Sequence, residues 1–228
     1  MDKYLKFLES KKTAHIPSGF DCGELHEKLF PFQKAIVKWA LKRGRSAIFA
    51  DTGLGKTMMQ VSWAHEVSKH TQGNVLIFAP LCVAIQTKEL AKEKLDININ
   101  YCRSQDQVKP GINITNYEML DHFDNSKLSG IVLDEASIIK SYDGKTTEKI
   151  LNKKKKIPYR LSCTATPSPN DYMELGNQAE FVGVMSREEM LAMFFIHDGG
   201  DTSKWRLKGH GESRFREWLS TWAVVVRK

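Results

Sequence analysis

Residues 50–57, ADTGLGKT, have the types and spacing needed to bind the phosphates of a nucleotide. Gly53 and Gly55 allow backbone N–H groups to turn around phosphate oxygens. A helix expected to begin at Lys56 would direct its positive end at the same anion. Lys56 would reach the β- and γ-phosphates, and the Thr57 hydroxyl would ligate Mg²⁺. The alternative is a glycine turn beside a chance lysine, but a strand before the segment and a helix after it favour a phosphate-binding loop.

Two adjacent carboxylates, Asp134 and Glu135, follow the apolar run 131–133. The carboxyl ends of parallel strands line one ligand crevice, so we expect this pair to lie beside the phosphate loop. Asp134 would then hold Mg²⁺, directly or through water, and Glu135 would orient and polarise the attacking water. The alternative is a solvated turn whose acidic residues cap the next helix.

Such a site requires strands that end at a common edge. Helical patterns over residues 56–70 and 83–95 separate several apolar, β-rich runs. The strongest of these runs are continuous rather than alternating, which is typical of strands buried on both faces of a parallel sheet. We therefore expect an α/β fold with a mainly parallel central sheet flanked by helices. The expected strands are residues 46–50, 75–79, 112–115, 131–134 and 159–163.

Composition agrees with an ordinary globular protein and excludes collagen, coiled coil and wholesale disorder. Of 228 residues, 34 are lysine or arginine and 27 are aspartate or glutamate, so the net charge of +7 permits a polyanion partner. No apolar run approaches the roughly 18 residues of a membrane span, and no secretory signal is evident. The four cysteines are far apart, which indicates reduced intracellular residues rather than a zinc site or a disulfide framework. We therefore expect a cytoplasmic protein without membrane contact.

The motifs together resemble those of superfamily 2 helicases. The loop begins with alanine, as in those enzymes, and the acidic pair with the following alanine resembles their second motif. Residues 163–167, CTATP, resemble the third motif, which in that family links nucleotide state to the grip on nucleic acid. The resemblance implies a RecA-like P-loop domain, with Thr164, Ala165 and Thr166 as coupling residues. The two threonines could instead be β-formers at a strand end.

Further segments narrow the resemblance to the Swi/Snf-type branch of double-stranded DNA translocases. Residues 32–33 resemble its adenine-reading region, and residues 79–81, 114–118 and 133–141 resemble its motif Ia, motif Ib and long motif II. The resemblance implies that the nucleotide contacts are Gln33, Thr52, Gly53, Leu54, Gly55, Lys56, Thr57 and Met58. It offers as DNA contacts Pro80, Leu81, Asn116, Tyr117 and Lys140. A strand end, an ordinary turn and a solvated charge are the plain alternatives for this second set.

The chain as a whole resembles compact phage-encoded Swi/Snf-like helicases, on residues 19–20, 32–33 and 222–224. A phage protein of this kind would act in the host cytoplasm. The resemblance is strongest over residues 18–182, the expected RecA-like ATP-binding domain. It leaves 1–17 as an N-terminal segment and 183–228 as a helical extension or connector.

Two departures from the family pattern stand out. Ser137 occupies a position where relatives often carry a histidine that couples hydrolysis to the rest of the core. These enzymes also place ATP between two RecA-like domains. We find no second domain, with its motifs IV to VI and its arginine, within these 228 residues. The expected protein is the ATP-hydrolysing first motor domain of a DNA helicase or translocase. Without a second domain, its turnover of ATP should be slow. It would use Mg²⁺, contact duplex DNA, and need a second RecA-like domain in cis or in trans.

Two other classes of function remain open: a P-loop enzyme such as a kinase, and a nucleic-acid-binding module with a vestigial nucleotide site. Three smaller signals also stay open. Phe20 would either stack on adenine or pack in the protein, and the lysine run 153–156 would either contact DNA phosphates or form a solvated connection. The third is a polar loop that would either contact DNA or simply pack against the protein. Its aromatic and basic residues are Trp205, Arg206, Lys208 and His210.

Overall fold

The computed structural model describes residues 17–228 except 142–143, 154–155, 169–170, 199–200 and 210. Within this part of the chain, seven strands form one sheet in which every neighbouring pair is parallel. The parallel sheet expected from the sequence is therefore confirmed. In sheet order the strands are β3 (Ile99–Tyr101), β4 (Ile112–Asn116), β2 (Asn74–Ala79), β5 (Leu128–Asp134), β6 (Tyr159–Thr164), β1 (Arg45–Ala50) and β9 (Ala223–Val226).

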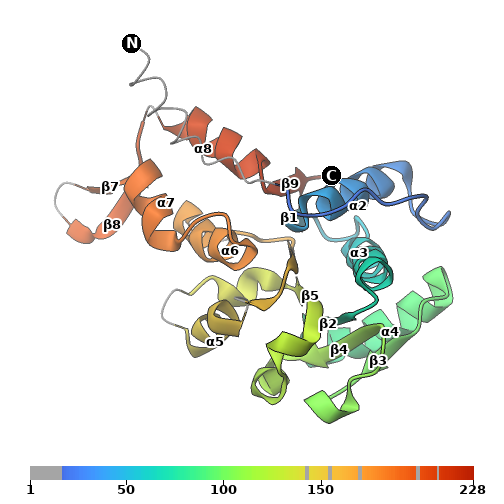
Figure 1. Ribbon diagram of the computed structural model, residues 1–228. Coiled ribbons are helices and arrows are strands. Elements are labelled where there is room, and N and C mark those ends of the chain that lie inside the picture. The colour runs from blue at the N-terminus through green and yellow to red at the C-terminus, as the bar shows by residue number, and fades with distance from the viewer. Residues whose placement is uncertain (1–16, 142–143, 154–155, 169–170, 199–200, 210) are drawn as a thin grey trace.

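Helices cover both faces of the sheet (Figure 1). One face carries α2 (Pro31–Arg43), α3 (Lys56–Thr71) and α4 (Leu81–Leu95), and the other carries α5 (Lys145–Lys153), α6 (Leu175–Val182) and α7 (Arg187–Phe194). A further helix, α8 (Glu212–Ser220), leads into β9. Short 3₁₀ turns are η1 (Gln105–Gln107), η2 (Tyr117–His122), η3 (Asn125–Lys127), η4 (Ala136–Ile139) and η6 (Tyr172–Glu174). None of the described helices combines the length and apolarity needed to cross a membrane.

The alternation of side chains along the strands divides the core into two apolar layers. In β2, Val75 and Ile77 belong to the layer beneath α2, α3 and α4, whereas Leu76 and Phe78 belong to the opposite layer. All four side chains are buried. Since both faces of the strand must be apolar, its sequence reads as a continuous run rather than as an alternation.

The C-terminal part of the chain differs from the helical extension that the sequence suggested. Helices α7 and α8 lie where helical patterns were expected, but the polar stretch between them contains an antiparallel hairpin of β7 (Phe195–Asp198) and β8 (Asp201–Leu207). Residues 224–228 were expected to form a connector, but 224–226 belong to β9, which pairs with β1 as the edge strand of the main sheet. The extension therefore contains strands as well as the expected helices.

This C-terminal segment shares the core of the preceding residues. The ring of Trp222 lies edge-on to Phe49 of β1, with centroids 6.1 Å apart, and 5.3 Å from the ring of Trp218. Trp222 is fully buried. An aromatic cluster thus joins α8 and β9 to the sheet, so the segment is part of the same packed unit.

Replacing Trp222 by alanine should lower the free energy of unfolding by about 3–5 kcal/mol, because it empties a buried site between β1 and α8. Trp39→Ala is the matched control, since Trp39 is only half-buried and rests against Arg43. Urea unfolding of the two variants and the parent, followed by far-ultraviolet circular dichroism, measures both losses. Equal losses would contradict a common core.

Candidate functional site

The phosphate-binding loop has the strand–loop–helix context that its sequence predicts. It leaves β1 at Ala50 and enters α3 at Lys56. Gly53 and Gly55 have φ angles of 87° and 77°, a left-handed conformation that favours glycine. A Cβ at position 55 would also lie 2.3 Å from Nε2 of Gln33. The backbone conformation at position 55 therefore favours glycine, and a Cβ there would displace the amide of Gln33.

Gln33 connects the start of α2 to this loop. Its Oε1 accepts a hydrogen bond from the Phe30 N–H at 3.0 Å, and its Nε2 donates to the Leu54 carbonyl at 3.0 Å. The first contact is the reach-back arm of a capping box, made from the third residue of the helix. Gln33 is buried, so the contact with adenine expected of it stays a prediction.

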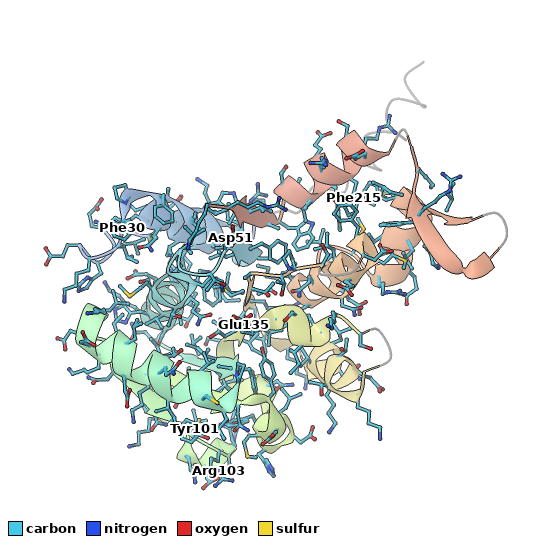
Figure 2. All side chains as sticks on the ribbon, turned by 180° about the vertical axis from the view of Figure 1, so that it is seen from behind. Phe30, Asp51, Tyr101, Arg103, Glu135 and Phe215 are labelled. Carbon is cyan, nitrogen blue, oxygen red and sulfur yellow. The ribbon has the colours of Figure 1, made fainter. Side chains whose placement is uncertain are left out.

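Phe30, which the sequence reasoning did not single out, forms an exposed aromatic pair with Phe32 beside Gln33. The rings of Phe30 and Phe32 are stacked, with centroids 6.2 Å apart, and both are among the exposed large apolar side chains. Figure 2 shows Phe30 on the side of the molecule where Asp51 of the phosphate loop lies. The available signal was the order FPFQ, in which Phe30 and Phe32 directly precede the buried amide.

Lys56 lies inside the loop with its ammonium held by the end of β1. Its Nζ donates to the Ala50 carbonyl at 3.2 Å. Thr57 and Met58 follow in the first turn of α3 and are half-buried. The lysine therefore sits where its charge acts on the loop and on the neighbouring strand ends.

The acidic pair stands at the end of β5, as predicted. Asp134 is only 3% exposed, and its Oδ1 accepts from the Glu135 N–H at 3.0 Å. Burial raises the pKa of the Asp134 carboxyl and the neighbouring Glu135 adds to this, whereas the Lys56 charge acts to lower it. Strand order β5–β6–β1 places a single strand between the pair and the loop. The predicted meeting of these two motifs is thus present in the fold.

Gln60 is a further residue beside the acidic pair, and the sequence reading missed it. It lies on α3, four residues after Lys56, and is fully buried. Neither polar atom of its amide has a hydrogen-bond partner of ordinary geometry. The amide nevertheless lies close enough to act, after burial itself, on the pKa of Asp134, which it lowers. A glutamine among the apolar residues of the buried helix face was the signal for it.

The turn at Glu135 is strained. Its φ and ψ of 51° and 51° are left-handed, a conformation that costs a non-glycine residue on the order of 1–3 kcal/mol. The Tyr117 hydroxyl donates to the Asp134 carbonyl at 2.6 Å and holds the chain just before the turn. The surroundings of the pair thus fix a backbone that the sequence alone would not favour.

The third motif adjoins the second across the sheet. Asp134 is the register partner of Cys163 in the β5–β6 pair. Thr164 ends β6, is fully buried, and accepts the Thr166 N–H on its Oγ1 at 3.1 Å. Ala165 is half-buried and Thr166 exposed, so the motif leads from the core to the surface beside the acidic pair.

The residues offered as DNA contacts divide into two groups. Leu81 is 51% exposed at the start of α4, next to the half-buried Pro80, and Lys140 is exposed. Asn116 and Tyr117 are buried instead. The Asn116 amide donates to the Glu118 carboxylate at 3.1 Å, and the Tyr117 hydroxyl donates to the backbone carbonyl of Asp134. Contact of these two residues with DNA stays a prediction, and little of either side chain is exposed to make it.

The structure describes some of the residues behind the three smaller sequence signals. Phe20 stacks on His70 near the end of α3 remote from the phosphate loop, with centroids 3.8 Å apart, so its ring packs within the protein. Trp205 packs half-buried against the core, whereas Arg206 is exposed. Residues 154–155 of the lysine run and His210 lie outside the described residues.

Residues 32–191 match the model of the SNF2-related domain family. The chain belongs to this family. A comparison with curated protein sequences gave no match.

Solved structures share the fold. The Sulfolobus solfataricus SWI2/SNF2 ATPase core in complex with dsDNA is 19% identical, with a TM-score of 0.69 over 93% of this chain and 46% of that one. The UvsW helicase from bacteriophage T4 is 16% identical, with a TM-score of 0.56 over 82% of this chain and 66% of that one. The Pyrococcus furiosus Hef helicase domain is 18% identical, with a TM-score of 0.57 over 70% of this chain and 39% of that one. This SNF2-related chain thus has a RecA-like fold and spans less than two thirds of each protein.

Asp134→Asn should raise the melting temperature of the metal-free, nucleotide-free protein at pH 7. The folded-state pKa of Asp134 is raised, so its ionised form destabilises the fold at neutral pH. That penalty, and with it the advantage of asparagine, should shrink as the pH falls through the folded-state pKa. Thermal melts between pH 7 and pH 4 measure the difference.

Glu89→Gln, on the exposed surface of α4, is the matched control for this series and should change little at any pH. A melting temperature at pH 7 that is lower for Asp134→Asn than for the parent would contradict the assigned cause of the shift.

Proposed function

We propose that this chain is the ATP-hydrolysing first motor domain of a Swi/Snf-type DNA helicase or double-stranded DNA translocase. The observation that carries the proposal is the meeting of the phosphate loop with the acidic pair, where the charge of Lys56 acts on the buried carboxyl of Asp134. Membership of the SNF2-related family supports the same assignment. A vestigial site would have no need to keep both halves of this arrangement.

The loop supplies the binding step. Its N–H groups and the start of α3 would hold the phosphates, and Lys56 would exchange the Ala50 carbonyl for the β- and γ-phosphate oxygens. The Thr57 hydroxyl and the Asp134 carboxylate are hard oxygen ligands of the kind that Mg²⁺ prefers. The Asp134 carboxyl is buried and burial raises its pKa, so a bound cation would stabilise its ionised form. Mg²⁺ there would neutralise charge on the transferring phosphoryl group.

Glu135 would perform the proton step. Its carboxylate would orient a water molecule for in-line attack on the γ-phosphate and accept its proton. The left-handed backbone at Glu135 sets the direction in which this side chain leaves the strand. Removing the carboxylate should therefore impair hydrolysis much more than nucleotide binding.

Three observations support a polynucleotide as the binding partner. Leu81 and Lys140 are exposed, the chain carries a net charge of +7, and one structural neighbour was solved in complex with dsDNA. Contacts of this kind go mainly to phosphates, so binding should be independent of base sequence and weakened by salt. Duplex DNA is the proposed partner.

A second RecA-like domain, in cis or in trans, would complete the site. The chain spans 46% of the SWI2/SNF2 ATPase core that it resembles. In the proposed enzyme the second domain supplies the arginine that stabilises the transferring phosphate, so this chain by itself should bind nucleotide and hydrolyse it slowly. A cytoplasmic location is part of the same proposal.

The test is Mg-ATP binding and hydrolysis by the chain, with and without duplex DNA. Lys56→Ala should weaken nucleotide binding at least about tenfold, and Glu135→Gln should keep binding but lose the slow turnover. Lys69→Ala is the matched control, because Lys69 is an exposed lysine at the far end of the same helix. Calorimetry and phosphate release measure the two steps.

Absence of nucleotide binding by the parent chain would overturn the proposal. DNA binding untouched by Lys56→Ala and Glu135→Gln, without any turnover, would favour the vestigial module. Turnover that ignores DNA but responds to a small-molecule or protein acceptor would favour a kinase-like enzyme. Rapid, Lys56-dependent turnover stimulated by DNA would show that the chain completes its own site.

A further inference from the structure

Helix α6 carries a pair of amide side chains that reach the two motifs at the sheet edge. Gln178 and Asn177 are both fully buried. Nε2 of Gln178 donates to the Ala136 carbonyl at 2.8 Å, and its Oε1 accepts from the Ser162 hydroxyl of β6. One side chain thus joins the turn after the acidic pair to the strand that leads into the third motif.

Asn177 holds the same turn further along. Its Nδ2 donates to the Ile139 carbonyl at 2.7 Å and to the Lys140 carbonyl at 3.3 Å. The turn is a single 3₁₀ segment, Ala136–Ile139, whose last carbonyls have no partner within the segment. Side chains of α6 therefore supply the donors that such a short helix cannot supply itself.

The two ends of this turn belong to different parts of the proposed site. It begins after Glu135, which would position the attacking water, and it ends at the exposed Lys140, which would face DNA. Ser162 lies two residues before Thr164, the start of the coupling motif. A displacement of the end of β6 would move Gln178 and, through it, the Ala136 carbonyl, because a buried amide that loses a partner is costly.

We propose that Gln178, assisted by Asn177, is a positioning residue that couples the nucleotide site to the DNA-facing turn. The inference rests on the proposed function. It names the residue that connects the binding sites for nucleotide and DNA. The link runs through α6, in a chain that carries Ser137 where relatives often have a coupling histidine. Gln178 touches neither nucleotide nor DNA, so its removal should change the coupling between them rather than binding of either alone.

The experiment measures how nucleotide changes DNA affinity. Fluorescence anisotropy of a labelled duplex gives the dissociation constant without nucleotide and with Mg²⁺ and a saturating non-hydrolysable ATP analogue. In the parent the ratio of the two constants should differ from one by about fivefold or more, a usual size for such coupling. Gln178→Met keeps the bulk of the side chain and removes both hydrogen bonds, and should bring the ratio within about twofold of one.

The matched control is Asn113→Leu. Asn113 is an equally buried amide on β4, bonded to both backbone groups of Lys109 and to Asn100. It should lower the melting temperature while keeping the parent ratio. Ser162→Ala removes only the hydroxyl contact and carries the test if Gln178→Met does not fold. It should bring the ratio closer to one while the analogue still binds.

Three results would overturn the proposal. Gln178→Met could keep the parent ratio although its melting temperature falls, and the amide link would then be structural only. If Gln178→Met does not fold, the same result in Ser162→Ala has the same meaning. The parent could bind the analogue and DNA with a ratio of one, which would remove the coupling and leave the proposed function standing. The parent could also fail to bind the analogue, in which case the proposed function fails and the inference with it.

Discussion

The candidate site is arranged around a buried carboxylate at the carboxyl end of a parallel strand. Asp134 is almost without solvent contact, and burial raises its pKa, so its ionised form needs a cation nearby. Lys56 approaches from a loop two strands away, because all strands of a parallel sheet end at the same edge. Gln60 acts to lower the pKa of Asp134, and the strained turn at Glu135 follows Asp134 directly in the chain.

The sequence predicted the parts of this arrangement that short-range patterns encode. Continuous apolar runs predicted the strands, and ADTGLGKT predicted the loop between β1 and α3. It did not predict the hairpin β7–β8 or the pairing of β9. AVVV is too short to distinguish an edge strand from a connector until its partner β1 is known. The burial of Tyr117 was not predicted either, because it depends on the position of Asp134.

The phosphate loop also faces the C-terminal end of the described chain. Asp51 donates its N–H to the Val226 carbonyl at 3.1 Å, and its Oδ2 accepts the Lys228 N–H at 3.1 Å. The loop is therefore in contact with β9 as well as with α2 through Gln33. Together with the amides of α6 that hold the turn after the acidic pair, these contacts bring several elements that are distant in sequence to the candidate site. Figure 2 shows Asp51 of the loop and Glu135 of the pair.

A second concave surface makes the location of the nucleotide a sharp test. A groove of about 700 Å³ lies between α2, α8 and β9, and its walls include Trp39, Phe215 and Val225. The decisive measurement is a titration of the isotope-labelled chain with Mg-ADP, followed by amide chemical shifts. The account predicts that the largest changes fall on residues 52–58 and 134–135. Changes confined to the walls of the groove, with the loop unaffected, would contradict it.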